Sequence, residues 1–385
     1  MKKYNLLLPI SGKAQRFIDA GYLVPKPLIL ARDKHIIDWS LSSVDTSECN
    51  LIFIVRLDHI YNFSIDKLLK QKFGDEITVM HVDKVTRGAL ETCALAKDHI
   101  NDDIPLYIYT PDVHFEPQFK PSSVPKGVDG FLLTFQANSP DHSYCEVDAN
   151  GLVSNVVEKE VISNQANVGL YHFGSGKLFL KYANEAIENN MLVKGEFYIA
   201  PIYNLMLRDK LKVTASETEK MHILGTPEQY EFFCKRVIAR FGVKPIALAC
   251  DHSGFHLKED ARKILDEKKI PYIDVGTYVD KSCDYIDYLN QSAKLLNQNE
   301  CDFGISFCRT GQGMNISANK IPGIISALTF DEYTAEYAIK HNCANHFSVP
   351  SKYVDKQKLS NMIDMWMKTS FDGGRHFTRL NKVRI

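Results

Sequence analysis

The sequence predicts an α/β protein of two domains, each built on a mostly parallel, Rossmann-like sheet flanked by helices. The chain has 385 residues, more than one ordinary hydrophobic core accommodates, so two domains are expected. Short apolar runs alternate with amphipathic stretches from its beginning, which is the rhythm of βαβ units. A Gly-Val-Lys-Pro break at residues 242–245 precedes a second alternating series. We therefore place the domains at residues 1–235 and 244–385.

Individual elements follow from the same pattern. In the first domain we expect strands at residues 4–10, 51–55, 77–82, 106–109 and 130–135, and helices at residues 36–44 and 89–100. Thr226 is expected to cap a helix that has Pro227 in its first turn and reaches about Phe241. The second domain is expected to begin with a strand at residues 246–249, and a later strand leads into Cys308.

Composition and charge exclude several classes of protein. With 46 basic and 47 acidic residues, nothing recommends a nucleic-acid or membrane-surface partner. No apolar run approaches the roughly 20 residues of a membrane span, and the apolar stretch at the start is too short for a signal-peptide core. The nine cysteines are scattered without a C-x-x-C pair, which favours reduced thiols over disulfides or a zinc site. We expect a cytoplasmic protein.

Two polar motifs follow apolar strands in the second domain. They are Asp251-His-Ser-Gly254 and Cys308-Arg-Thr-Gly-Gln-Gly313, and both are expected at the carboxyl ends of neighbouring parallel strands, where open α/β sheets bind ligands. A reaction that moves a carbonyl between C1 and C2 of a sugar phosphate needs a base, a pocket for the enediolate oxygen and cations for the phosphate. Cys308 is a candidate thiolate base, and the turn after it offers backbone N–H groups. A lone cysteine at a strand end is most often inert, and the Thr-Gly-x-Gly context favours catalysis here.

Together with His341-Asn342, Gly373-Gly-Arg-His376 and Arg379, these motifs resemble the ribose-5-phosphate isomerase B family, which includes galactose- and allose-6-phosphate isomerases. The resemblance covers residues 244–385 and implies an aldose–ketose isomerase that needs no cofactor. It also implies a homodimer or homotetramer formed through this domain, in which His341 and the arginines of one copy meet Cys308 of another.

The resemblance assigns roles to single residues. Cys308 would be the base, Thr310 would add its hydroxyl, His341 would open the sugar ring, and Asp251 would assist opening or bind substrate hydroxyls. The other substrate-binding residues would be His252, Arg309, Gly311, Gly313, Asn342, Lys352, Arg375 and Arg379. Arg375 and Arg379 lie one helical turn apart and can grip a phosphate.

Three positions in this domain depart from the family pattern. Arg309 stands where relatives usually have glycine, Ile325 where they often have arginine, and Lys352 where an arginine is common. A bulky cation next to the base reshapes the pocket, so we expect the preferred sugar to differ from ribose 5-phosphate.

The first domain begins with a small-residue loop after its first strand. Gly12 lies in this loop, Arg16 follows it, and Lys26 stands in a Pro-Lys-Pro-Leu segment. Backbone N–H groups of such a loop can bind phosphate, and the two cations can stabilise a leaving pyrophosphate. The two segments resemble the signature of sugar-phosphate nucleotidyltransferases, and the resemblance covers residues 1 to about 233.

This second resemblance implies a nucleoside triphosphate and a sugar phosphate as substrates and Mg²⁺ as cofactor. Asp112, at the end of the 107–112 motif, would bind the metal, and Gly88 lies in the expected nucleobase loop. Lys159, Gly169 and Glu196 match elements on the acceptor-sugar side. The chain departs from the family pattern at the Ile10-Ser-Gly-Lys13 loop and at Leu224, where a second acidic metal ligand often precedes Gly-Thr.

The leading interpretation is a bifunctional enzyme that supplies activated sugars for surface polysaccharide. The isomerase product carries its phosphate on the terminal carbon, whereas most nucleotidyltransferases use an anomeric phosphate. Either another enzyme intervenes or the first domain accepts a terminal phosphate. Two alternatives stay open: the second domain is a non-catalytic sugar-phosphate-binding and oligomerisation module, or the first domain binds nucleotide without transferring it.

Overall fold

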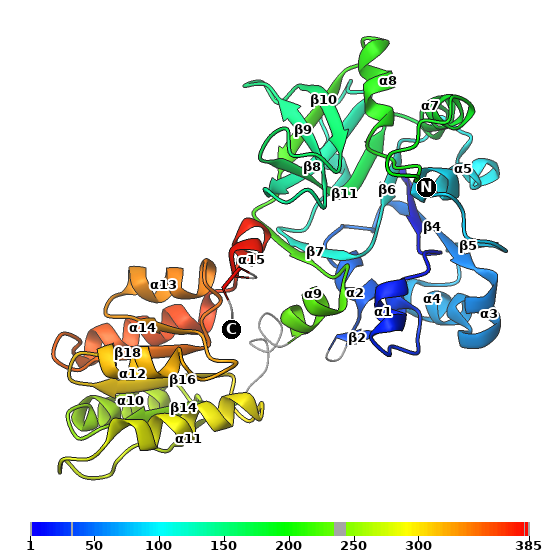
Figure 1. Ribbon diagram of the computed structural model, residues 1–385. Helices are drawn as coiled ribbons and strands as arrows, with labels where there is room; N and C mark the ends of the chain where they lie inside the picture. Colours follow the sequence, from blue (N-terminus) through cyan, green and yellow to red (C-terminus); the bar gives the residue numbers. More distant parts are fainter. Residues whose placement is uncertain (1, 32–33, 235–243, 381, 384–385) are drawn as a thin grey trace. The chain divides into compact units, whose positions relative to one another are not determined.

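The computed structural model describes residues 2–31, 34–234, 244–380 and 382–383 (Figure 1). The chain forms two compact units, Met1–Tyr230 and Glu231–Ile385. The junction that we expected between residues 235 and 244 lies outside the described residues, apart from Lys244 at its end. Each unit combines helices with one main sheet, so the predicted α/β class is confirmed.

The strands of the first unit are β1 (Tyr4–Pro9), β2 (Leu30–Ala31), β3 (Lys34–His35), β4 (Cys49–Arg56), β5 (Thr78–Val82), β6 (Leu106–Tyr109), β7 (Val113–Glu116), β8 (Gly130–Gln136), β9 (Ser143–Val147), β10 (Val153–Glu158), β11 (Gln165–Phe173), β12 (Val213–Glu217) and β13 (Lys220–Ile223). Its helices are α1 (Gln15–Asp19), α2 (Ile36–Leu41), α3 (Leu57–Phe63), α4 (Ile65–Phe73), α5 (Ala89–Ala94), α6 (Lys97–Ile100), α7 (Gly176–Glu188), α8 (Ile202–Arg208) and α9 (Pro227–Phe232), with 3₁₀ turns η1 (Lys26–Leu28) and η2 (Pro121–Ser123). α9 extends two residues into the second unit.

The main sheet of the first unit has nine strands. Strands β5, β4, β1 and β6 pair in parallel, as the alternating pattern predicted. β11 pairs antiparallel with β6 and carries β8 and β9 along its other edge, an antiparallel extension that the sequence analysis did not anticipate. The parallel strands are therefore followed, within the same sheet, by antiparallel strands.

Alternating side chains of the central strands fill two cores on opposite faces of this sheet. Leu7 and Ile52 pack in one core with residues of α5, α7 and α8. Leu8 and Phe53 pack in the other with residues of α2 and α4. Burial on both faces explains why these strands are nearly continuous apolar runs.

Two expected helices differ in extent from the prediction. The helix expected at residues 89–100 is divided into α5 and α6. The hydroxyl of Thr226 accepts a hydrogen bond from the Gln229 N–H at 3.3 Å, which is the expected cap of α9. The predicted continuation of this helix towards residue 241 lies outside the described residues from residue 235 onward.

The second unit has a five-stranded sheet in the order β15-β14-β16-β18-β17, and every pairing is parallel. Its strands are β14 (Ile246–Cys250), β15 (Tyr272–Asp274), β16 (Phe303–Cys308), β17 (Ser326–Leu328) and β18 (His346–Pro350). Its helices are α10 (Phe255–Glu267), α11 (Tyr285–Asn297), α12 (Gln312–Ala318), α13 (Glu332–Lys340), α14 (Lys356–Lys368) and α15 (Gly374–Leu380).

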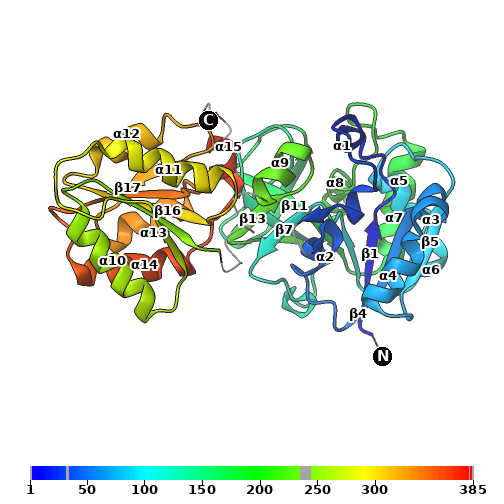
Figure 2. The same ribbon diagram turned by 90° about the horizontal axis from the view of Figure 1, so that it is seen from below.

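The two faces of this sheet carry side chains of different size. Large residues such as Ile305 and Phe307 pack against α10, α13 and α14. The opposite face presents small residues, including Gly304 and Ser306, towards α11 and α12, which Figure 2 shows on the other side of the sheet. A Cβ atom at Gly304 would lie 2.8 Å from Ser292 of α11, so the helix packs closely against the strand.

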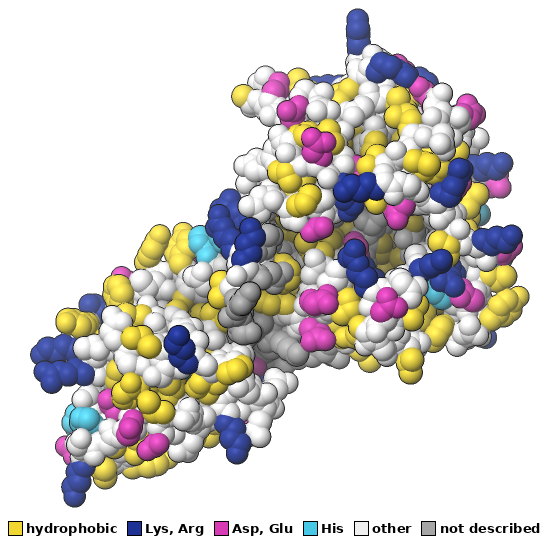
Figure 3. Space-filling model, in the orientation of Figure 1, with side chains coloured by type: hydrophobic (Ala, Val, Ile, Leu, Met, Phe, Trp, Pro, Cys, Tyr) yellow, Lys and Arg dark blue, Asp and Glu magenta, His cyan; other side chains and the backbone are white. Residues whose placement is uncertain are grey.

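Charge and hydropathy agree with the composition. Figure 3 shows both basic and acidic side chains on the face that it draws. Among the helices of the described residues, none has the length and apolar character that crossing a membrane would require.

Candidate functional site

Asp112 and Lys26 meet at the carboxyl end of the parallel strands in the first unit. Asp112 lies just beyond β6, and Lys26 is the first residue of η1. The Lys26 ammonium lies 3.2 Å from an Asp112 carboxylate oxygen, and the Lys26 side chain is 17% exposed. The backbone carbonyl of Asp112 accepts from the Leu224 N–H at 2.7 Å, which ties the 224–226 loop to the same place.

A cavity of about 410 Å³ opens beside Asp112. Four of the predicted site residues line it, namely Arg16, Asp112, Lys159 and Gly169. The Lys159 ammonium donates to the backbone carbonyl of Asp141 and lies 5.7 Å from the centre of the Tyr198 ring. Lys26 is absent from the lining and reaches the cavity through its ion pair with Asp112.

Gly169 allows the backbone to approach the cavity closely. Its φ angle is 97°, and the register of β11 against β8 shifts between Asn167 and Tyr171. A Cβ atom at this position would lie 2.4 Å from the Thr110 hydroxyl oxygen. The glycine is therefore required by the backbone conformation and by the contact with Thr110.

The cavity also contains buried titratable groups that the sequence analysis did not select. Burial raises the pKa of Glu158 to about 7, and the neighbouring Lys159 opposes this shift. Burial lowers the pKa of His142 to about 4. Glu158 directly precedes the predicted Lys159, but no sequence signal distinguished its buried carboxyl from a solvated one, and His142 belongs to none of the motifs described above.

A second cavity of about 510 Å³ contains the other predicted residues of this unit, Gly12, Gly88 and Glu196. Gly88 precedes α5 and has a φ angle of 150°, and a Cβ atom there would lie 2.3 Å from the backbone oxygen of Phe197. Glu196 was assigned to the acceptor side by resemblance, and the structure brings it together with Gly12 and Gly88 instead. Ala89 lines both cavities.

The donor groups beside Asp112 fit a divalent cation. The side-chain oxygen of Gln229 is buried and has no hydrogen-bond partner among the described residues. A Cβ atom added to Gly225 would lie 3.2 Å from this oxygen and 3.6 Å from an Asp112 carboxylate oxygen. The Gln229 and Asp112 oxygens therefore lie on the same side of Gly225 and at most 6.8 Å apart, and oxygen is the kind of donor that Mg²⁺ prefers.

In the second unit, the predicted motifs lie at the carboxyl edge of the sheet. Asp251 follows β14 and Cys308 ends β16, and these strands are paired neighbours. The Asp251 carboxylate accepts from the Gly254 N–H at 2.9 Å, and burial raises its pKa. The ring nitrogen Nδ1 of His252 accepts from the Cys283 N–H at 3.3 Å, which leaves Nε2 as the ring's second polar atom.

The turn after β16 begins with two exposed residues, Arg309 and Thr310. Gly311 has a φ angle of 72°, and a Cβ atom there would lie 2.4 Å from the Leu328 side chain. A Cβ atom at Gly313 would lie 3.0 Å from the Tyr285 ring. The Lys352 N–H donates to the Arg309 carbonyl at 3.2 Å, so Lys352 lies at the same edge.

Cys308 itself is 6% exposed. It belongs to an apolar cluster with Leu289 and Ala293 of α11 and Met314 of α12. The strand edge and the glycine turn are as predicted, but the thiol faces packed side chains in the single chain. Its neighbours would have to admit substrate for the thiol to act as a base.

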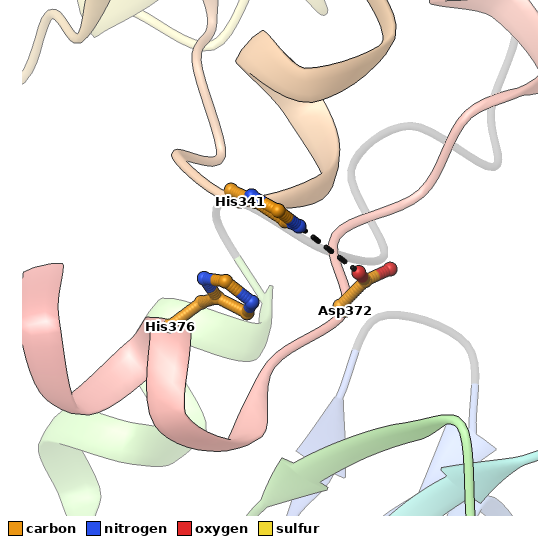
Figure 4. A group of neighbouring side chains, drawn as sticks. All are labelled: His341, Asp372 and His376. Atoms are coloured by element: carbon orange, nitrogen blue, oxygen red, sulfur yellow. Dashed lines mark ion pairs between the residues drawn. The ribbon is translucent and has the colours of Figure 1, made fainter. Parts of the chain in front are cut away.

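His341 belongs to a second group, which Figure 4 shows together with Asp372 and His376. The His341 ring stacks on the His376 ring with 4.0 Å between centres, and His341 Nε2 lies 3.9 Å from an Asp372 oxygen. Burial lowers the pKa of both histidines, to about 4 for His376, and the charges of Arg375 and Arg379 lower both further.

Donor spacing alone would let this group hold a metal ion, since one ligand atom from each residue lies within 4.8 Å of the others. The charges of Arg375 and Arg379 lower the pKa of both rings and so oppose a cation there, whereas Asp372 raises the pKa of His341. Both arginines are exposed on α15, and Asn342 is exposed beside His341. The two arginines can donate hydrogen bonds to an anion such as phosphate.

The Cys308 group and the His341 group lie at opposite ends of the strands of the second unit's sheet. Cys308 ends β16, whereas His341 follows α13 and precedes β18. The backbone carbonyl of Asn345 accepts from the Gly304 N–H at 3.0 Å, which puts the end of this connection at the amino end of β16. Because a six-residue strand spans roughly 17 Å, we expect His341 and Cys308 of one chain to lie too far apart to share one small substrate.

The comparisons with known proteins concern the two halves of the chain separately. A family model described as Ribose/Galactose Isomerase matches residues 246–383. Ribose-5-phosphate isomerase B of Escherichia coli is 35% identical over 141 residues, which are 37% of this chain and 95% of that protein. A nucleoside-diphosphate-sugar pyrophosphorylase structure from Vibrio cholerae matches with a TM-score of 0.55 and 25% identity, over 60% of this chain and 99% of the other. With residues 246–383 the chain belongs to the ribose/galactose isomerase family, and that region is joined to an N-terminal half similar to a nucleoside-diphosphate-sugar pyrophosphorylase.

Proposed function

We propose that the chain is a bifunctional cytoplasmic enzyme that isomerises a sugar phosphate and transfers a nucleotidyl group to a sugar phosphate. The observation that carries this proposal is the presence of two separate constellations, one around Asp112 and one around Cys308, each at the carboxyl end of parallel strands. All nine cysteines are free, which agrees with a reducing compartment in which Cys308 stays a thiol.

In the isomerase, Cys308 takes the proton from the carbon next to the carbonyl, which yields an enediolate. The backbone N–H groups of the turn at residues 309–313 and the Thr310 hydroxyl stabilise its oxygen. During ring opening, neutral His341, whose pKa is lowered by burial, accepts the proton of the anomeric hydroxyl as the carbonyl forms, and it returns that proton to the ring oxygen as the bond between this oxygen and the anomeric carbon breaks. Arg375 and Arg379 bind the phosphate.

The complete isomerase site requires two copies of the chain. His341 and the two arginines lie at one edge of the sheet and Cys308 at the other, so one copy supplies the base and a second supplies the ring-opening and phosphate groups. This arrangement makes the active form a homodimer or homotetramer. It also brings a partner surface near the buried Cys308 thiol.

In the nucleotidyltransferase, the sugar phosphate attacks the α-phosphorus and pyrophosphate leaves. Asp112 would hold Mg²⁺, whose charge would offset the repulsion between the two anionic substrates. Arg16 and Lys26 stabilise charge on the leaving pyrophosphate, and Lys159 orients the acceptor phosphate. The cavity that contains Gly12 and Gly88 receives the nucleotide, and the one that contains Gly169 receives the sugar.

The two reactions together would supply an activated sugar for surface polysaccharide. An isomerase product carries a terminal phosphate, so this chain either accepts that phosphate directly or relies on an intervening phosphate transfer. A second candidate function is a nucleotidyltransferase with a non-catalytic sugar-phosphate-binding module. The 6% exposure of Cys308 favours this second candidate.

Hydrogen exchange distinguishes the two candidates. The full chain is incubated in D₂O with pentose and hexose phosphates, and deuterium at C2 is followed by NMR. We expect exchange in the wild type and none in Cys308→Ala, with Cys301→Ala as a control that removes a second buried thiol. Absence of exchange with every sugar would assign the domain to binding alone.

Pyrophosphate release tests the first domain. The full chain is assayed with CTP, UTP, GTP and dTTP against a library of terminal and anomeric sugar phosphates. We expect release with one nucleotide and one class of phosphate. Tight nucleotide binding without release in any combination would leave the domain as a binding module.

A further inference from the structure

Leu224 stands where related nucleotidyltransferases often have a second acidic metal ligand, and its side chain is fully buried in the core. The site beside Asp112 therefore lacks a carboxylate at that position. Among the described residues that line the cavity, only Gln229 and Asn167 have a buried side-chain oxygen without a hydrogen-bond partner. The Gln229 oxygen lies near Asp112, since both are beside Gly225.

We infer that the Gln229 side-chain oxygen is the second protein ligand of the divalent cation bound at Asp112, in place of the missing acid. This inference rests on the proposed nucleotidyl transfer. Both oxygens lie beside Gly225, at 3.2 and 3.6 Å from its ideal Cβ position, so they are at most 6.8 Å apart and a small side-chain rotation can bring them to one cation. A carboxamide oxygen is an ordinary ligand for a hard cation.

The surrounding backbone holds Gln229 in place. The Gln229 N–H donates to the Thr226 hydroxyl at 3.3 Å, and the Tyr230 hydroxyl donates to the Leu30 carbonyl at 2.6 Å. The Leu224 N–H bonds to the Asp112 carbonyl at 2.7 Å, so the loop that leads to α9 is fixed to the metal-binding residue. These three hydrogen bonds fix the chain around Gln229, whereas the Gln229 side-chain oxygen has no hydrogen-bond partner among the described residues.

Replacing a carboxylate by a carboxamide changes the charge of the site. The two proposed ligands, Asp112 and Gln229, together supply one negative charge. The Lys26 ammonium, 3.2 Å from the Asp112 carboxylate, offsets part of this charge. Such a site binds a cation weakly until phosphates add their charge, since ligand charge largely sets the affinity for hard cations. The cation would accordingly enter with the nucleoside triphosphate.

Binding of Mn²⁺ alone to the full chain, followed by the electron paramagnetic resonance signal of the free ion, tests the inference. We expect Gln229→Glu to bind Mn²⁺ about tenfold more tightly than the wild type and Gln229→Leu to bind it more weakly. Gln71→Glu adds the same charge at an exposed position of α4 and should leave the affinity unchanged.

The opposite results are equally defined. Equal affinities of Gln229→Glu and Gln71→Glu, or wild-type affinity in a folded Gln229→Leu, would remove Gln229 from the metal site. The same holds if the wild type binds no Mn²⁺ and Gln229→Glu gains none. Asp112→Asn distinguishes a failure of the Gln229 inference from a failure of the proposed function. If this variant keeps wild-type Mn²⁺ binding and pyrophosphate release, the assignment of a metal site to this domain is wrong, irrespective of the results for Gln229.

Discussion

The Lys26 ammonium and the Asp112 carboxylate form an ion pair of 3.2 Å in the first unit. The pair lies beside the cavity that four of the predicted site residues line. The two residues come from segments 86 positions apart in the sequence. Their contact links the cation expected to assist the leaving pyrophosphate with the carboxylate expected to bind Mg²⁺. If Asp112 holds a metal ion, its carboxylate would give up part of this ion pair, and the Lys26 ammonium would then be available to phosphate.

Asp112→Asn should lower pyrophosphate release at least about 100-fold, because the metal then loses its only charged protein ligand. Lys26→Met should lower it by a similar factor while leaving Mn²⁺ binding intact or tighter, since the carboxylate loses a competing cation. Steady-state pyrophosphate assays and Mn²⁺ titrations measure both. Lys177→Met, which removes an exposed lysine paired with Asp103, is the matched control.

Cys308 and His341 should complement each other between copies of the chain. Cys308→Ala and His341→Gln are each expected to be inactive as isomerases. When the two variants are mixed under conditions of subunit exchange, about a quarter of the sites regain both groups, so about a quarter of wild-type exchange at C2 should return.

A mixture that stays inactive, although labelled chains are shown to exchange, would mean that both groups act within one copy or that the domain has no isomerase activity. Mixing Cys308→Ala with Cys308→Ser serves as the control, because no combination of these chains restores the thiol. Wild-type C2 exchange decides between the two explanations.

Much of this architecture could be predicted because its signals are local. The strands around Leu7 and Phe53 are apolar on both faces, and Thr226 caps its helix through one hydrogen bond. The antiparallel β11 could not be found in the same way, since its pairing with β6 depends on residues about 60 positions away. Local pattern therefore gave the parallel strands and missed their antiparallel extension.

The candidate sites show the same division. Cys308 and Asp251 could be placed at one sheet edge, because parallel neighbouring strands end together. The burial of the Cys308 thiol and the unpartnered oxygen of Gln229 depend on side chains of other elements. Neither property can be predicted from the residues next to Cys308 or Gln229 in the sequence.

Gly169→Ala should destabilise the first unit more than Gly74→Ala. The two glycines have nearly the same φ angle, 97° and 96°, but only Gly169 has a neighbour within 4 Å of its ideal Cβ. Gly74→Ala thus measures backbone strain alone, roughly 1–3 kcal/mol. Gly169→Ala adds the contact with the Thr110 hydroxyl, so its effect on the free energy of unfolding should be larger by roughly 1–3 kcal/mol.

Urea unfolding followed by Trp39 fluorescence in a Trp366→Phe background measures these differences in the first unit. The double variant Thr110→Ala/Gly169→Ala removes the hydroxyl that the new Cβ would meet and should recover most of the additional loss. Equal effects of the two single variants, or no recovery in the double variant, would show that the close contact is relieved by a small backbone shift.

His346 should make the second unit sensitive to acid. Its ring is fully buried, its Nε2 has no hydrogen-bond partner among the described residues, and burial lowers its pKa from 6.5 to about 4. Because the unfolded chain binds a proton below pH 6.5 that the folded chain does not, the stability is present above pH 6.5 and is lost as the pH falls towards 4. The loss should reach roughly 3 kcal/mol at pH 4.

His346→Asn should flatten this part of the pH profile, because the variant has no group that takes up the proton on unfolding. Trp366 stacks on Phe347 and reports on this unit, and Trp39→Phe leaves it as the single tryptophan of the chain. Urea unfolding of that background between pH 7.5 and 4 gives the slope. His256→Asn, at an exposed position of α10, should keep the wild-type slope. If His346→Asn and His256→Asn follow the same profile, the acid sensitivity of the sheet arises from another group.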